Sequence, residues 1–185
     1  MRRDVYSGTL RLHGEENQTT LIEANNYAMN LLDLRRFEEV KSLLRRTIPV
    51  ARRVFGGNHE FTLKMRWAYA DALYQDPGAT LDDLREAVTR LEDIERTARR
   101  VFGGSHPTVF DIEVSLRTAR TALRALKKKV DDLRKAVAKL EDALPDARRD
   151  LGSSDPLVRS MERNLRDSRA ALRARETPSA PPDIW

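Results

Sequence analysis

The sequence predicts an all-α protein built as a short right-handed array of helix–turn–helix repeats. Three observations predict it: a glycine-containing string recurs along the chain, apolar residues follow three- and four-residue spacing, and Gly and Pro fall at a few joints. We expect a single array over residues 1–176, with units at about 10–56, 57–103 and 104–152 and a partial unit at 153–176. Residues 177–185 are expected to form a flexible tail.

The repeat is visible by comparing the chain with itself. The string from Ala51 to His59 returns from Ala98 to His106, and again with more substitutions at 147–155. Residues 80–125 also align with 129–174 at a constant offset of 49, with about half of the positions identical. Identity at this level within one chain indicates an internal duplication.

Composition limits the classes of function. Hydrophobic residues make up 40% of the 185 residues, enough for a buried core, and charged residues make up 34%. The chain has no cysteine, which excludes disulfides, thiolate metal sites and cysteine nucleophiles and favours a cytoplasmic location. No apolar stretch is long enough to cross a bilayer, so no membrane partner is expected.

The first unit reads as two helices. Residues 1–14 align with 43–56, which predicts a helix that ends at Gly14. Thr19 and Thr20 can cap the next helix, and a polar joint follows at 33–36. The apolar face of that helix consists of Leu21, Ala24, Tyr27, Ala28, Leu31 and Leu32.

The next helix begins near Phe37 and stops at Gly56, because glycine tolerates the positive φ of a helix end. In the second unit the joint from Asp76 to Ala79 separates two helices, and Ala79 or Thr80 opens the second of them. We expect the acidic pairs Asp82–Asp83 and Asp131–Asp132 in first turns of helices, where they favour the positive end of the dipole.

The third unit supports two predictions. The duplication predicts a hairpin that turns near Lys127–Lys129. Apolar or small residues at three- and four-residue spacing from Val109 to Leu144, with no Gly or Pro between Thr108 and Leu144, instead predict one long helix with a coiled-coil seam. The terminal helix, with Val158, Met161, Leu165 and Leu172, would pack against either arrangement.

Two groups of residues resemble the tetratricopeptide repeats of the kinesin light chain family. They are the set Asn26, Tyr27, Ala28, Leu31, Phe37, Val40 and Leu44, and the turn from Phe102 to Thr108. The resemblance covers about residues 10–176 and implies an adaptor or scaffold whose first helices line a groove. It further implies that Asn26 faces that groove and bonds a peptide backbone. The later units depart from the pattern, since Arg117 and Arg166 replace the small Ala28 and Ala70.

The first helix of each pair is therefore the expected binding surface. Trp67 is a candidate aromatic anchor, and an arginine stripe on the third unit, repeated as Arg166, Arg169 and Arg173, could hold an acidic peptide. The candidate partner-binding residues are Asn25, Asn26, Met29, Lys64, Trp67, Asp71, Tyr74, Arg117, Arg120 and Arg124.

No motif indicates catalysis, a cofactor or a metal. His13, His59 and His106 are not spaced as ligands on one helix, and we read His59 and His106 as turn residues that bond nearby backbone. Gly56–Gly57 and Gly103–Gly104 lack the Lys and Ser or Thr of a phosphate loop. We therefore expect a non-enzymatic protein–protein interaction module that binds a peptide or helix. One alternative is a homo-oligomer formed through the heptad at 109–144, and a less favoured one is nucleic-acid binding through the basic C-terminal half.

Overall fold

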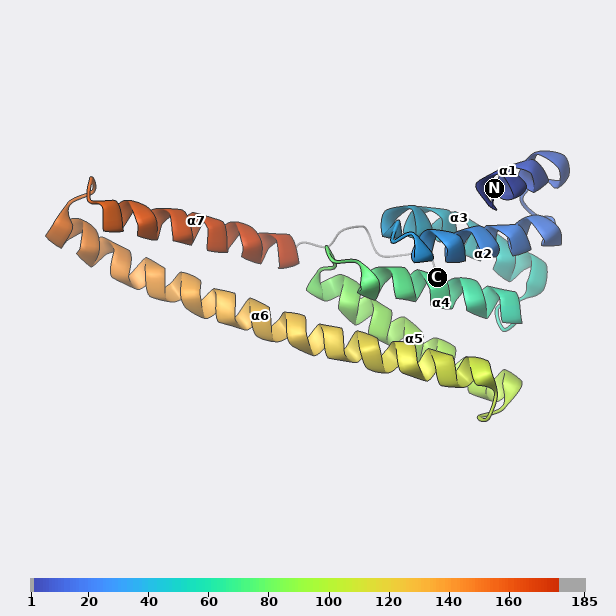
Figure 1. Cartoon of the computed structure of the whole chain (residues 1–185). Helices are drawn as coiled ribbons and strands as arrows, with labels where there is room; N and C mark the ends of the chain where they lie inside the picture. The colour runs from blue at the N-terminus through green and yellow to red at the C-terminus, as the bar shows by residue number, and fades with distance from the viewer. Residues whose placement is uncertain (1, 177–185) are drawn as a thin grey trace.

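The computed structural model describes residues 2–176, and every regular element among them is an α-helix, as the sequence predicts (Figure 1). Short turns connect successive helices, and the C-terminal half of the sixth helix extends away from the rest together with the seventh (Figure 1). The helices are α1 (Arg2–His13), α2 (Gln18–Asp33), α3 (Phe37–Phe55), α4 (Glu60–Gln75), α5 (Leu81–Phe102), α6 (Pro107–Leu151) and α7 (Pro156–Glu176).

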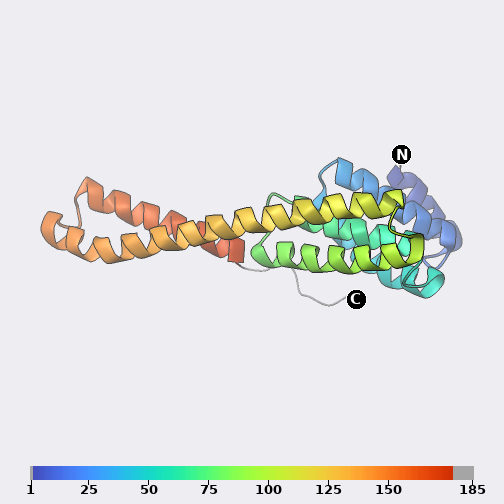
Figure 2. The same ribbon diagram turned by 90° about the horizontal axis from the view of Figure 1, so that it is seen from below.

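Helices α1 to α6 pack mainly against their neighbours in sequence, and two contacts skip one helix, from α2 to α4 and from α4 to α6. Figure 2 shows α4, α5 and the first half of α6 grouped at one end of the molecule. One apolar cluster lies among α2, α3 and α4, and a second lies among α4, α5 and α6. The apolar spacing of the sequence thus places these helices around shared cores.

The recurring glycine string forms the same turn each time. Gly56, Gly103 and Gly152 end their helices with φ of +96°, +87° and +83°, and each amide donates to the carbonyl four residues earlier. In the first two turns a histidine then caps the next helix. His59 Nδ1 accepts from the Phe61 amide at 3.3 Å, and His106 Nδ1 accepts from the Thr108 amide at 3.2 Å. The reading of these two histidines as turn residues is confirmed.

The helix starts agree with the sequence only in part. Thr80 caps α5 in a full capping box with Asp83. The sequence predicted Ala79 or Thr80 at this start, and Thr80 is the one observed. The expectation for α2 is wrong, because Asn17 is the cap: its side chain accepts from the Thr19 amide at 2.8 Å, and Thr19 and Thr20 already belong to the helix. Asparagine is among the best capping residues.

The third unit contains one continuous helix, α6, rather than a hairpin at Lys127–Lys129. Its 45 residues correspond to about 68 Å at 1.5 Å per residue. The placement of Asp131 and Asp132 in a first helical turn is therefore wrong, since both lie in the middle of α6. The helix also continues past Leu144 through Pro145, where the heptad pattern stops.

Helix α7 packs along the C-terminal half of α6, as expected for the terminal helix. The shared core is thin: Val137, Leu144, Val158 and Leu165 are its buried members. The tail predicted at 177–185 lies outside the described residues.

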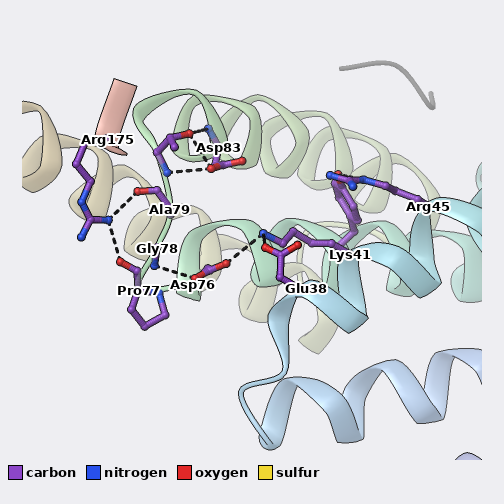
Figure 3. A network of polar contacts seen from close by, with 11 residues as sticks. Glu38, Lys41, Arg45, Asp76, Pro77, Gly78, Ala79, Asp83 and Arg175 are labelled. Atoms are coloured by element: carbon purple, nitrogen blue, oxygen red, sulfur yellow. Dashed lines mark hydrogen bonds and ion pairs between the residues drawn. The ribbon is translucent and has the colours of Figure 1, made fainter. Parts of the chain in front are cut away.

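A polar network fixes the joint between α4 and α5 (Figure 3). Lys41 Nζ lies 3.1 Å from Asp76 Oδ2 and also pairs with Glu38. The Lys41 side chain is only 2% exposed. From the other side, Arg175 of α7 donates to the carbonyl oxygens of Pro77 at 2.8 Å and Ala79 at 3.1 Å. The joint thereby contacts both α3 and the end of α7.

Candidate functional site

The three predicted partner-binding residues of α2 differ in the solvent exposure of their side chains. Met29 is 43% exposed, as an outward position requires. Asn26 is partly exposed, and its Nδ2 donates to Glu23 Oε1 at 3.5 Å. Asn25 is only 6% exposed, so its side chain is not available at the surface as a predicted partner-binding residue would be. Within residues 2–176 its buried Oδ1 has no hydrogen-bond partner.

The predicted residues of α4 form a polar cluster with α6. Trp67 Nε1 donates to Ser115 Oγ at 2.9 Å, while the indole packs against the apolar cluster beneath. Tyr74 is partly buried beside it, and burial is the main cause that raises its pKa. Trp67 is therefore a half-buried side chain that joins α4 to α6, with one part left at the surface.

Asp71 is the ionisable group most affected by this cluster. Burial raises its pKa from 3.8 to about 6, and the polar groups of Ser115, Tyr74 and Trp67 offset that effect only in part. Its Oδ1 is buried without a hydrogen-bond partner among the described residues. A carboxylate in this setting is costly to ionise, so Asp71 is partly protonated near neutral pH.

Lys64 lies near the beginning of α4 and is partly exposed. Its Nζ lies 2.5 Å from Glu60 Oε1, and 5.8 Å from the centre of the Phe61 ring. Lys64 therefore already has a local acidic partner, and its ammonium is shared between that carboxylate and the ring face.

The three predicted arginines of α6 line one groove between α5 and α6, with a volume of about 430 Å³. Arg120 pairs with Glu92 of α5 at 2.7 Å. Arg117 and Arg124 are exposed, and neither forms an ion pair with any of the residues 2–176. The groove is lined by Glu95, Arg99, Glu113, Leu116, Arg117, Arg120, Thr121 and Arg124. We call it the basic groove.

The basic groove has a copy between α6 and α7, with a volume of about 450 Å³. All eight lining positions correspond at the offset of 49 residues, and six of them keep the same residue. The ion pair between Arg148 and Glu162 repeats that of Arg99 with Glu113, and Arg169 with Glu141 repeats Arg120 with Glu92. The duplication therefore preserved a surface and its charges as well as a helix pattern.

A further cavity of about 600 Å³ lies among α3, α4 and α5, and no sequence prediction included it. Arg52, Arg66, Arg90 and Arg100 line it, and Arg66 pairs with Asp93 at 2.5 Å. Arg52 and Arg100 come from the recurring string, which is the signal that could have indicated them.

The predicted residues thus fall into two sets. The residues of α2 and α4 share one side of the array, and Trp67 and Asp71 meet α6 through Ser115. The arginines of α6 line a groove with α5, and no residue of α2 or α4 lines that groove.

The part of the chain that the structure describes contains no group of three or more His, Asp or Glu residues that could hold a metal ion. Over the same residues, no helix combines the length and the apolar character needed to cross a membrane. No family model matches this chain, and no curated protein matches its sequence.

Proposed function

We propose that this protein is a protein–protein interaction module, an adaptor or scaffold of the tetratricopeptide type, that binds a helix or peptide carrying acidic side chains. The observation that carries the proposal is the basic groove, where Arg117 and Arg124 are exposed and form no ion pair with the described residues. Exposed arginines on a groove wall favour carboxylate partners, because a guanidinium can donate two hydrogen bonds to one carboxylate.

The internal packing supports a helix as the form of the ligand. Helix α5 lies on α4 much as a ligand helix would lie on α6, and Arg66 of α4 meets Asp93 of α5 there. Leu116 supplies apolar surface at the floor of the basic groove. The α2 and α4 side, with Met29 and Trp67, is proposed as a second contact region for a longer ligand.

The test is affinity capture from a nuclease-treated cytoplasmic extract, with three versions of the chain. The groove variant carries Arg117→Glu and Arg124→Glu, and the control carries Arg11→Glu and Arg163→Glu, which change net charge equally at exposed positions outside the groove. We expect proteins retained by the wild type and the control to be lost from the groove variant. Identical sets from all three versions would remove the basic groove as a binding site.

A third variant, Met29→Glu, separates the two contact regions. Its loss of the same proteins would extend the site to α2, while unchanged capture would confine the site to α5 and α6. Each variant should keep the helical circular dichroism of the wild type, since all of the substituted side chains are exposed.

A further inference from the structure

The structure contains a template for how a helix covers α6. On α4, Leu63 and Ala70 share a buried cluster with Leu91, Ile94 and Ala98 of α5. Ala87 of α5 is also fully buried. This face of α5 therefore packs against α4, and residues of α6 join the same cluster.

The duplicated copy of that α5 face is only partly covered. At the offset of 49 residues, Ala87 and Ile94 correspond to Ala136 and Ala143 of α6, which are exposed. Leu91 corresponds to Leu140, which is only partly buried. Helix α7 shares a core with Val137 and Leu144 of α6, and Leu140 packs against that core, whereas Ala136 and Ala143 stay exposed. Nothing within residues 2–176 takes the place that α4 has on α5.

The copy of the covering helix is exposed in part as well. The turn histidines His59 and His106 lie 47 residues apart, so Leu63 and Trp67 of α4 correspond to Phe110 and Val114 of α6. Phe110 is 62% exposed and Val114 is 41% exposed. Both are large apolar side chains at positions whose α4 counterparts pack into the core, which marks a contact surface.

Helix α6 thus contains copies of both surfaces that pack together between α4 and α5, but these copies cannot reach each other within one helix. Phe110 and Ala143 lie 33 residues apart on a continuous helix, or about 50 Å. The contact requires either a turn within α6, which the structure does not have, or the other half from a second molecule.

We propose that two copies of this chain associate side by side through antiparallel α6 helices, around a two-fold axis near Lys127. Residues 130–147 of each copy then pack on residues 109–124 of the other, as α5 packs on α4. The inference rests on the proposed function, because it identifies the helix at the basic groove as one from a second copy. In a two-fold dimer each copy contributes both faces, so residues 130–147 of one copy pack on residues 109–124 of the other, and the same contact forms a second time with the copies exchanged.

The two halves of α6 differ in charge. Between Arg117 and Lys129 the chain has six basic residues and no acidic one, whereas Asp131, Asp132, Glu141 and Asp142 follow within the opposing half. Transposing the Arg66–Asp93 pair by the two repeat offsets places Glu113 of one copy beside Asp142 of the second copy, and in that same antiparallel register Arg124 lies opposite Asp131. The Arg124–Asp131 pair favours the antiparallel register.

Engineered cysteines test the pairing directly, because the chain has no cysteine of its own. The double variant carries Phe110→Cys and Ala143→Cys, and each single variant serves as a control. On mild oxidation we expect the double variant to form disulfide-linked dimers, and both single variants to remain monomeric on non-reducing gels. A cross-link within one chain, or no cross-link in the double variant, overturns the proposal.

A second test changes the centre of α6. Replacing Lys127→Asp, Lys128→Pro and Lys129→Gly introduces the residues that form the joint at Asp76–Gly78. By sedimentation velocity, the wild type should rise from 21.2 kDa toward twice that mass with concentration, and this variant should stay at 21.2 kDa. A control with Lys127→Ala, Lys128→Ala and Lys129→Ala keeps the helix and should still dimerise.

The outcomes separate the two proposals. A wild type that stays at 21.2 kDa at every concentration, without dimer cross-links, removes the second copy as the ligand. The proposed function then still stands if other proteins are captured by the wild type and lost from the Arg117→Glu, Arg124→Glu variant. If the chain dimerises and that variant dimerises equally well, the dimer stands and the basic groove loses its assigned role.

Discussion

Replacing Asp71 with asparagine should make the protein more resistant to unfolding at high pH, relative to the wild type. Burial raises the pKa of Asp71 to about 6 in the folded chain, against 3.8 for the unfolded one. The folded state therefore holds the proton more tightly, so this group favours folding below about pH 4 and opposes it increasingly as pH rises to about 6 and above. Asparagine keeps the shape of the side chain and does not ionise.

The magnitude follows from the difference between the two pKa values. A shift of roughly two units corresponds to about 3 kcal/mol of unfavourable free energy once Asp71 is fully ionised. Between pH 5 and pH 8 the variant should gain about 1.5 kcal/mol of unfolding free energy over the wild type. Any effect of the substitution that does not depend on pH cancels in this comparison.

The assay is urea denaturation of both proteins at several pH values between 5 and 8, followed by circular dichroism. All other titrating groups are shared, so they contribute equally to both curves. The gap should widen up to about pH 7 and then stay constant. Curves that remain parallel throughout would show that Asp71 titrates normally in the folded chain and is not buried as the structure has it.

Two further predictions concern stability. Asp76→Asn should lower the unfolding free energy by about 2 kcal/mol, because it leaves the buried Lys41 ammonium with Glu38 alone. Lys41→Met should cost less than about 1 kcal/mol, because it removes the buried charge itself. Urea denaturation curves that show the reverse order would contradict the assigned pairing. Gly103→Ala should cost about 1–3 kcal/mol in thermal unfolding although its Cβ would meet no atom within 4 Å, because a φ of +87° with ψ of 152° is strained for alanine. The control Gly8→Ala, inside α1, should be neutral or slightly stabilising.

The sequence predicted the helical class and most joints because their causes are local. Glycines with positive φ, the capping Thr80 and the joint at Asp76–Ala79 act through the residues beside them. The start of α2 was missed because Asn17, Thr19 and Thr20 can all cap a helix, and only the geometry selects one.

The shape of the third unit could not be decided from the sequence. The duplication favours a turn near Lys127–Lys129, but no residue there breaks a helix, and the structure follows the local preference. Pattern alone also misplaced Asn25, because its burial depends on how the neighbouring helices pack on α2. The basic groove was predicted as an arginine stripe, but its pairing with Glu92 depends on how α5 lies beside α6.

The contact of Arg175 with the joint has a consequence for the order of folding. Among the hydrogen bonds described, it joins residues 98 positions apart, whereas the array otherwise packs helix on neighbouring helix. Neighbour contacts close short loops and can form early, one after another along the chain. The Arg175 contact must wait until α5, α6 and α7 are all in place, because only then do its two ends meet. We therefore expect it to form after the transition state, so that its loss speeds unfolding and leaves the folding rate unchanged.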